Sequence, residues 1–214
     1  MIQFEKLGIF LSRPIAFVLV LIYMLQSGLL VYLISEKFEL EKQINFQQKR
    51  IDELEDRLQI FKAIDDFQIG FNNEEVGQLT DVIYSESQKY QYDPMFILAV
   101  IMTESSFKRR QVSPKGARGL MQVIPFVGKD VAPRAGVEWE GNETLHEPTA
   151  NIKLGTLHLF EQILKFKDVK KALVAYNMGE SRLRKLMREN KPIPSAYLDQ
   201  VMKYYKMLKE TYQV

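Results

Sequence analysis

A single glutamate stands at the end of a very apolar stretch of this sequence. Glu104 follows the eight-residue run Met95–Met102, in which every side chain is apolar. Such a run predicts a helix that is buried on all sides, with Ile97, Val100 and Ile101 directly beneath Glu104. Loss of hydration disfavours the charged form of a carboxyl group and raises its pKa. We therefore predict that Glu104 stays protonated near neutral pH and can donate a proton to a bound molecule.

The segment after Glu104 contains residues that suit a binding loop. A Ser-Pro turn begins at Ser113, and Gly116 and Gly119 allow the backbone to approach another chain or a ligand closely. Gln122 brings a hydrogen-bond donor and an acceptor to the same loop. These residues favour a site over the alternative, in which Glu104 merely frays into solvent at a helix C-terminus.

Caps and apolar spacing predict that the elements around Glu104 are helices. Asn73 is the predicted N-cap of the first helix, and Asp93 with Pro94 caps the helix that carries Glu104. Further helices are predicted over Pro148–Phe166, Val169–Tyr176 and Tyr197–Tyr212, with a break at Lys191–Pro194. Because no window shows strand alternation between turn signals, the sequence predicts an all-α domain over residues 73–214.

The N-terminal part of the chain has a different composition. Residues 14–34 carry no charge, and twenty-one residues make roughly 32 Å of helix, enough to cross a bilayer. We predict a transmembrane signal-anchor helix here, preceded by a short tail over residues 1–13. The stretch is long for a cleaved secretory signal, and its one cluster of small residues, Ser27-Gly28, lies in the middle. Positive charges on both sides leave the orientation undecided.

Residues 35–72 are predicted to form a helical stalk. Apolar residues recur at steps of four and three, the spacing of a and d positions in a heptad, with one polar exception: Leu40, Ile44, Gln47, Ile51, Leu54, Leu58 and Phe61. This spacing favours a coiled coil, so that residues 36–62 would bind a second copy or a partner helix. The alternative is a lone helix with solvated faces.

Charge and composition exclude several classes of site. Residues 74–214 carry 21 Lys and Arg against 17 Asp and Glu, which suits a polyanionic neighbour but is too weak for nucleic-acid binding. The chain has no cysteine, and its two histidines, His146 and His158, lie far apart without a metal-binding motif. We therefore expect no metal and no cofactor, and we interpret His158, inside a predicted helix, as structural.

Three motifs in order resemble a known family. They are Glu104-Ser105, the segment Val112–Gln122, and the pair formed by Asn151–Gly155 and Ala175-Tyr176-Asn177. Together they resemble the catalytic domain of the soluble-type lytic transglycosylases, the lysozyme-like family that cleaves bacterial peptidoglycan. The resemblance covers roughly residues 76–205.

The resemblance implies a role for individual residues. Glu104 would be the single catalytic acid and base, and Tyr176 would steady the glutamate or the neighbouring sugar. The implied substrate-binding residues are Ser113, Met121, Gln122, Tyr176, Asn177 and Tyr197. The sequence departs from the family pattern at Val127, where threonine is common, and at His146-Glu147-Pro148, which replaces a more usual acidic segment.

The resemblance also implies a reaction and a location. Glu104 would cleave the β-1,4 bond between MurNAc and GlcNAc in glycan strands and form a 1,6-anhydroMurNAc end without water. One alternative is a goose-type hydrolytic lysozyme, for which Asp130, Glu138, Glu140 or Glu143 would activate water. Another is a non-catalytic scaffold that binds peptidoglycan. The substrate places residues 35–214 on the periplasmic or wall side of the cytoplasmic membrane, which the chain would span once.

Overall fold

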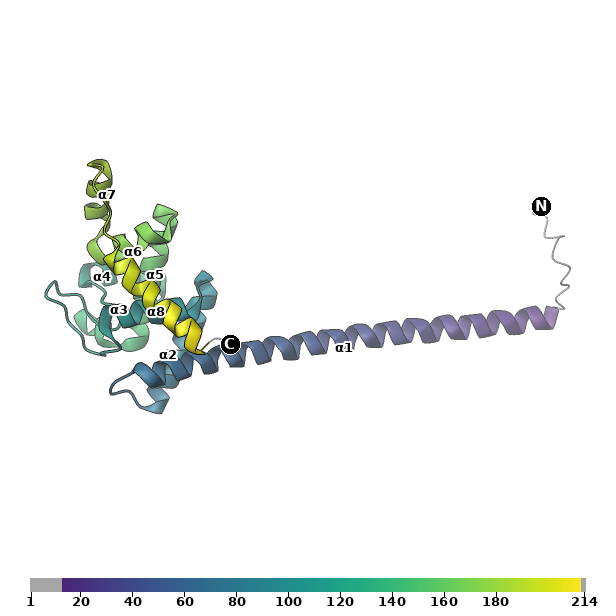
Figure 1. Cartoon of the computed structure of the whole chain (residues 1–214). Coiled ribbons are helices and arrows are strands. Elements are labelled where there is room, and N and C mark those ends of the chain that lie inside the picture. Colours follow the sequence, from purple (N-terminus) through teal and green to yellow (C-terminus); the bar gives the residue numbers. More distant parts are fainter. Residues whose placement is uncertain (1–12, 213–214) are drawn as a thin grey trace. The chain divides into compact units, whose positions relative to one another are not determined.

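The computed structural model describes residues 13–212, and within this range the chain is helical, without a β-strand (Figure 1). The predicted all-α class is therefore confirmed. Two isolated β-bridges join Arg118 to Val112 and to Val123. The helices are α1 (Arg13–Phe67), α2 (Asn73–Tyr90), α3 (Pro94–Ser105), α4 (Pro125–Ala135), the 3-10 helix η1 (Asn142–His146), α5 (Pro148–Phe166), α6 (Val169–Met178), α7 (Glu180–Arg188) and α8 (Ala196–Tyr212).

The chain divides into two compact units, Met1–Glu53 and Leu54–Val214. Helix α1 runs without interruption through the predicted span and most of the predicted stalk, and its part up to Glu53 belongs to the first unit. The apolar window of this helix has a mean hydropathy of 2.3 and no buried residue, and its length and composition suffice to cross a membrane. The seam residues Leu40, Ile44 and Ile51 are also exposed. Self-association through this seam stays a prediction, and the predicted tail lies outside the described residues except for Arg13.

The second unit already begins inside α1. Ile60, Ala63 and Ile64 are buried in the same hydrophobic core as α2 and α3. Arg57 forms an ion pair with Asp81 of α2. The core of this unit thus includes the last turns of the segment expected to be a stalk, whereas composition alone placed the boundary at residue 72.

Helix α3 lies at the centre of the core. Asp93 caps it by accepting a hydrogen bond from the backbone N–H of Met95 (2.9 Å), and Pro94 occupies the first turn. Ile97, Val100 and Ile101 are completely buried, as the apolar run predicts. The predicted helix and the apolar floor beneath Glu104 are confirmed.

Helix α8 packs against α3, and the contacts at the two ends of the pair show that the helices run in opposite directions. At one end of the pair, the Asp93 carboxylate accepts hydrogen bonds from the Tyr205 hydroxyl (2.8 Å) and from the Lys209 ammonium (2.7 Å). At the other end, Tyr197 contacts Glu104. The two helices are therefore bonded at both ends, which fixes the register between Tyr197 and the carboxyl group.

Other predicted elements differ from the structure in detail. The N-cap of α2 is Asn72 rather than Asn73: its side chain accepts from the N–H of Glu75 (2.9 Å), and the Glu75 carboxylate accepts from the N–H of Asn72 (3.0 Å). The sequence analysis did not predict α4 and α7. Helix α4 contains Pro133 in its interior, and α7 has only nine residues, of which one, Leu183, is buried, so neither gives a long periodic apolar pattern.

A buried asparagine on α5 holds the loop that follows α3. The Oδ1 atom of Asn151 accepts from the N–H of Met121 (2.7 Å). Its Nδ2 group donates to the carbonyl oxygens of Arg118 (2.9 Å) and Leu145 (2.9 Å). Gly119, with φ of 76°, lies so close that a Cβ atom there would be 2.2 Å from the Leu145 carbonyl oxygen. This arrangement joins the glycine-rich motif to the Asn151 motif.

We predict that Gly119→Ala destabilises the domain much more than Gly116→Ala. Both glycines have positive φ, but a Cβ atom at Gly116 would meet nothing within 4 Å. Gly116→Ala should cost about 1–2 kcal/mol of unfolding free energy from backbone strain alone. Gly119→Ala should cost about 3–5 kcal/mol because it also displaces Asn151. Urea unfolding measures both, and equal losses would contradict the proposed close approach.

Candidate active site

A cleft of about 300 Å³ opens beside the C-terminal end of α3. Among the described residues that line this cleft, Glu104 alone carries a carboxyl group. Four of the six residues predicted to bind substrate also line it. The wall consists of Glu104, Ser113, Pro114, Lys115, Ala117, Gln122, Val123, Ile124, Val127, His158, Tyr176 and Asn177.

The environment of Glu104 favours its protonated form. Burial raises the pKa of Glu104 from its ordinary value of 4.5 to about 7, and a hydrogen bond from Tyr197 opposes part of this rise. The apolar floor of α3 removes water from beneath the carboxyl group, while the cleft leaves it open on the other side. A carboxyl group with this pKa can act as an acid and, after giving up its proton, as a base near neutral pH.

Tyr197 determines which carboxyl oxygen is available to a ligand. Its hydroxyl group on α8 donates to Oε1 of Glu104 at 2.5 Å. Oε2 has no hydrogen-bond partner within residues 13–212. When Glu104 is protonated, Oε1 acts as the carbonyl-type acceptor for Tyr197, so the proton resides on Oε2.

Tyr176 lines the cleft, but its hydroxyl group bonds to the loop rather than to Glu104. It donates to the carbonyl oxygen of Met121 at 2.7 Å. Burial, followed by the nearby charge of Glu104, raises the pKa of Tyr176 well above its ordinary value. The ring therefore forms a neutral wall of the cleft and ties α6 to the glycine-rich motif.

Gln122 is held in a strained and oriented position. Its backbone has φ of 48°, which is unusual for a residue other than glycine. Its Nε2 group donates to the carbonyl oxygens of Gln111 (3.0 Å) and Gly119 (2.9 Å). Both amide hydrogens are thereby used, and Oε1 remains as an acceptor for a ligand in the cleft.

Of the other predicted substrate-binding residues, Ser113 and Asn177 line the cleft and Met121 does not. Ser113 lines the cleft in a turn, where its hydroxyl group accepts from the N–H of Ala117 (3.1 Å). Asn177 is exposed at the cleft wall, near the end of α6. The side chain of Met121 is fully buried and does not line the cleft, so Met121 takes part through its backbone carbonyl group.

His158 is a cleft residue that the sequence analysis interpreted as structural. It lies in the cleft wall, and its ring centroid is 5.3 Å from that of Tyr176. Asn151, Gly155 and His158 follow one another at steps of four and three, which places them on one face of α5. This spacing would have indicated that His158 faces the same loop as Asn151.

Comparison with known proteins shows which family has this sequence pattern. Residues 81–206 match the family described as Transglycosylase SLT domain. The chain belongs to this family. The matched residues include α3, the glycine-rich loop, α5, α6 and most of α8, so the family region contains the whole cleft wall.

Several relatives share this region of the chain. A transglycosylase of Enterobacteria phage PRD1 is 34% identical over 105 residues, which are 49% of this chain and 36% of the relative. A putative soluble lytic murein transglycosylase of Haemophilus influenzae is 33% identical over 46% of this chain and 17% of the relative. The membrane-bound lytic murein transglycosylase C of Actinobacillus pleuropneumoniae is 31% identical over 53% of this chain and 34% of the relative. The chain thus spans about a third of these relatives' length or less.

A solved structure shows the same fold. It is an inactive mutant of the lytic transglycosylase Slt from Pseudomonas aeruginosa, with a TM-score of 0.54 and 23% sequence identity. The similarity covers 61% of this chain and 24% of that protein. The predicted lysozyme-like helical fold is confirmed.

We predict that the stability of Glu104→Gln relative to the wild type increases as the pH rises from 5 to 8. The folded pKa of Glu104, about 7, exceeds its ordinary value of 4.5. The wild type therefore has its full stability below pH 4.5 and loses stability as the pH rises through 7. The unfolding free energy of Glu104→Gln minus that of the wild type should increase by about 2 kcal/mol between pH 5 and pH 8. Urea unfolding at the two pH values measures this difference. If this difference in unfolding free energy is the same at pH 5 and pH 8, the carboxyl group of Glu104 is hydrated and has an ordinary pKa.

Tyr197→Phe provides the control for this experiment. Its hydrogen bond lowers the pKa of Glu104, so removing the hydroxyl group should move the pKa above 7. The loss of stability should then extend to higher pH than in the wild type. If Tyr197→Phe loses stability over the same pH range as the wild type, the hydroxyl group of Tyr197 does not stabilise the Glu104 carboxylate.

Proposed function

We propose that this protein is a peptidoglycan lytic transglycosylase that uses Glu104 as its single acid and base. The observation that carries this proposal is the position of the Glu104 carboxyl group, which lies over the apolar floor of α3 and lines the cleft. Burial raises its pKa to about 7. Relatives named as lytic murein transglycosylases support the choice of a glycosidic bond in peptidoglycan as the substrate.

In the first step, the proton on Oε2 of Glu104 passes to the oxygen of the bond between MurNAc and GlcNAc. The bond from this oxygen to C1 of MurNAc breaks, and GlcNAc leaves with the electron pair. As the family resemblance implies, the N-acetyl group of MurNAc supports the cation that develops at C1. The hydroxyl group of Tyr197 stabilises the new carboxylate through its bond to Oε1.

In the second step, the Glu104 carboxylate takes the proton of the C6 hydroxyl group of MurNAc. The oxygen at C6 then bonds to C1, which closes a 1,6-anhydro ring and returns Glu104 to its protonated form. Water is not consumed. One carboxyl group therefore serves both steps, and its pKa near 7 suits both transfers.

The cleft residues suggest how the sugar is positioned. Oε1 of Gln122 would accept a hydrogen bond from a hydroxyl or amide N–H group of the substrate, since its amide hydrogens are already used. Ser113 and Asn177 offer further polar groups at the cleft wall. Tyr176 would hold the wall in place through Met121, and Tyr197 would act on the sugar only through Glu104.

A goose-type hydrolytic lysozyme is less well supported. That reaction would need a second carboxylate to activate water, and the four candidates from the sequence do not line the described cleft. Asp130 instead forms an ion pair with Arg134 (3.0 Å). A non-catalytic scaffold is also disfavoured, because such a protein has no need of a proton donor at the end of α3.

We further propose that residues 14–34 anchor the chain in the cytoplasmic membrane and that residues 35–214 lie on the periplasmic or wall side. The exposed apolar window of α1 supports the anchor. In this arrangement residues 35–72 form the stalk and residues 73–214 form the catalytic region, whose core also takes in the end of α1.

We expect the purified enzyme to release fragments that end in 1,6-anhydroMurNAc from peptidoglycan, with activity that falls above about pH 7 as Glu104 loses its proton. Mass spectrometry of the digest measures this outcome, since the anhydro product is lighter than the hydrolytic product by one water. Reducing MurNAc ends would overturn the proposal in favour of hydrolysis.

Glu104→Gln is the matched control, because it keeps the shape of the side chain and removes the transferable proton. Its turnover should fall by at least about 1,000-fold, since both proton transfers are lost. Unchanged clearing of peptidoglycan in a gel by this variant would remove Glu104 from the mechanism.

We expect that deletion of residues 14–34 moves the protein from the membrane fraction to the soluble fraction, because these residues carry the apolar window. In intact spheroplasts, added protease should degrade residues 35–214 of the full chain. Protection of this region would contradict the proposed topology, and a deletion variant that stays in the membrane fraction would contradict the anchor.

A further inference from the structure

His158 is a polar residue in the cleft wall that the proposed mechanism does not use. It lies on α5, and its ring contacts the ring of Tyr176 at a centroid distance of 5.3 Å with a tilt of 40°. The hydroxyl group of Tyr176 is bonded to Met121, so this neighbour is fixed. The imidazole ring therefore has a defined position relative to Glu104, which lines the same cleft.

The ring nitrogens of His158 have no protein partner among residues 13–212. Neither nitrogen belongs to the buried polar atoms that lack a partner, a group that does include His146 Nδ1. Both nitrogens of His158 therefore keep some accessible surface, and the residue lines the cleft. Polar groups of a largely buried side chain normally have a hydrogen-bond partner, so a ligand in the cleft is a candidate partner for this ring.

Burial favours the neutral form of the His158 ring. Burial lowers the pKa of His158 below its ordinary value of 6.5. The charged groups that act on it are Asp130 on α4, Glu161 and Lys165 on α5, and Glu180 on α7. A neutral imidazole ring offers one N–H donor and one acceptor, which matches the hydroxyl and acetamido groups of an amino sugar.

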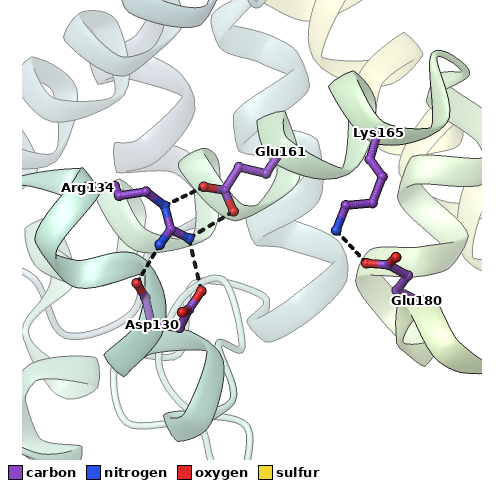
Figure 2. A network of polar contacts seen from close by, with 5 residues as sticks. All are labelled: Asp130, Arg134, Glu161, Lys165 and Glu180. Carbon is purple, nitrogen blue, oxygen red and sulfur yellow. Dashed lines mark hydrogen bonds and ion pairs between the residues drawn. The ribbon is translucent and has the colours of Figure 1, made fainter.

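Ion pairs hold these carboxylates in place (Figure 2). Arg134 donates to Glu161 through Nε (2.8 Å) and to Asp130 through Nη2 (3.0 Å). Lys165 donates to Glu180 at 2.6 Å. Arg134 thus pairs with two of the carboxylates and Lys165 with the third, and the effect of burial on the pKa of His158 outweighs the upward effect of the three carboxylates. The same pairs join α4 and α7 to α5.

We propose that His158 is a substrate-binding residue that hydrogen-bonds the amino sugar next to the scissile bond through both ring nitrogens. This inference rests on the proposed function and names a contact within it. The neutral ring would orient the hydroxyl or acetamido groups of the sugar against the wall of Tyr176. It would contribute to binding of the ground state and take no part in proton transfer to the leaving group.

The test is the affinity of Glu104→Gln protein for a purified tetrasaccharide of alternating GlcNAc and MurNAc, measured by calorimetry with and without a second substitution at position 158. His158→Phe keeps a ring beside Tyr176 and removes both polar atoms. It should weaken binding about tenfold, as expected for lost hydrogen bonds. In the otherwise wild-type enzyme, KM should rise about tenfold while kcat changes less than about threefold.

His158→Asn and His158→Gln separate hydrogen bonding from packing, because each keeps a donor and an acceptor without the ring. At least one of them should recover affinity to within about threefold of the parent protein. Equal weakening by all three variants would overturn the proposal, since packing on Tyr176 would then explain the loss. Unchanged affinity in a His158→Phe protein of normal melting temperature would overturn it as well.

The proposed function and this inference fail in different ways. If the wild type forms anhydro products and His158→Phe binds the tetrasaccharide normally, the enzyme assignment stands and the role of His158 is wrong. If the wild type forms no anhydro products and Glu104→Gln does not bind the tetrasaccharide, both are wrong.

Discussion

A carboxyl group that must give up a proton and take it back has to be shielded from water on one side and open to its substrate on the other. Glu104 meets this requirement because it is the first polar residue beyond the fully apolar part of α3 that also reaches the cleft. The rest of the domain follows from this placement. Helices pack around α3 to keep its floor dry, and the loop from residue 106 to residue 124 forms the cleft that leaves one face of the carboxyl group accessible.

The family motifs lie far apart in the sequence, but they form one bonded unit. Asn151 uses every hydrogen-bonding group of its side chain on the loop and on η1, and Tyr176 donates to the same loop at Met121. Gly119 and Gly155 bring the loop into contact with α5, since a Cβ atom at either position would overlap its neighbours. The motif residues therefore build the frame of the cleft, and few of them need to touch the sugar. Met121 illustrates this distinction, because its side chain is buried while its backbone connects three elements.

The sequence was sufficient to predict the α3 helix, its Asp93 cap and the raised pKa of Glu104, because each depends on residues within a few positions of one another. The partners of Tyr197 and Tyr176 could not be predicted in the same way, since they lie 93 and 55 residues away along the chain. The sequence analysis placed Tyr176 beside the glutamate, whereas the hydroxyl group that contacts Glu104 is that of Tyr197. Helix α7 was not predicted because its three apolar residues lie among charged residues in a stretch of only nine residues. His158 was interpreted as structural because it is a lone histidine inside a predicted helix.

Helix α8 connects two distant parts of the second unit. Its first turn carries Tyr197, and its last turn carries Tyr212, whose hydroxyl group donates to Asp66 at 2.5 Å and whose ring meets Phe67 edge-on. A helix of 17 residues moves as a nearly rigid rod, so a displacement at one end is transmitted to the other. The contacts at the two ends of α8 therefore link the last residues of α1 to the side chain that bonds the proton donor.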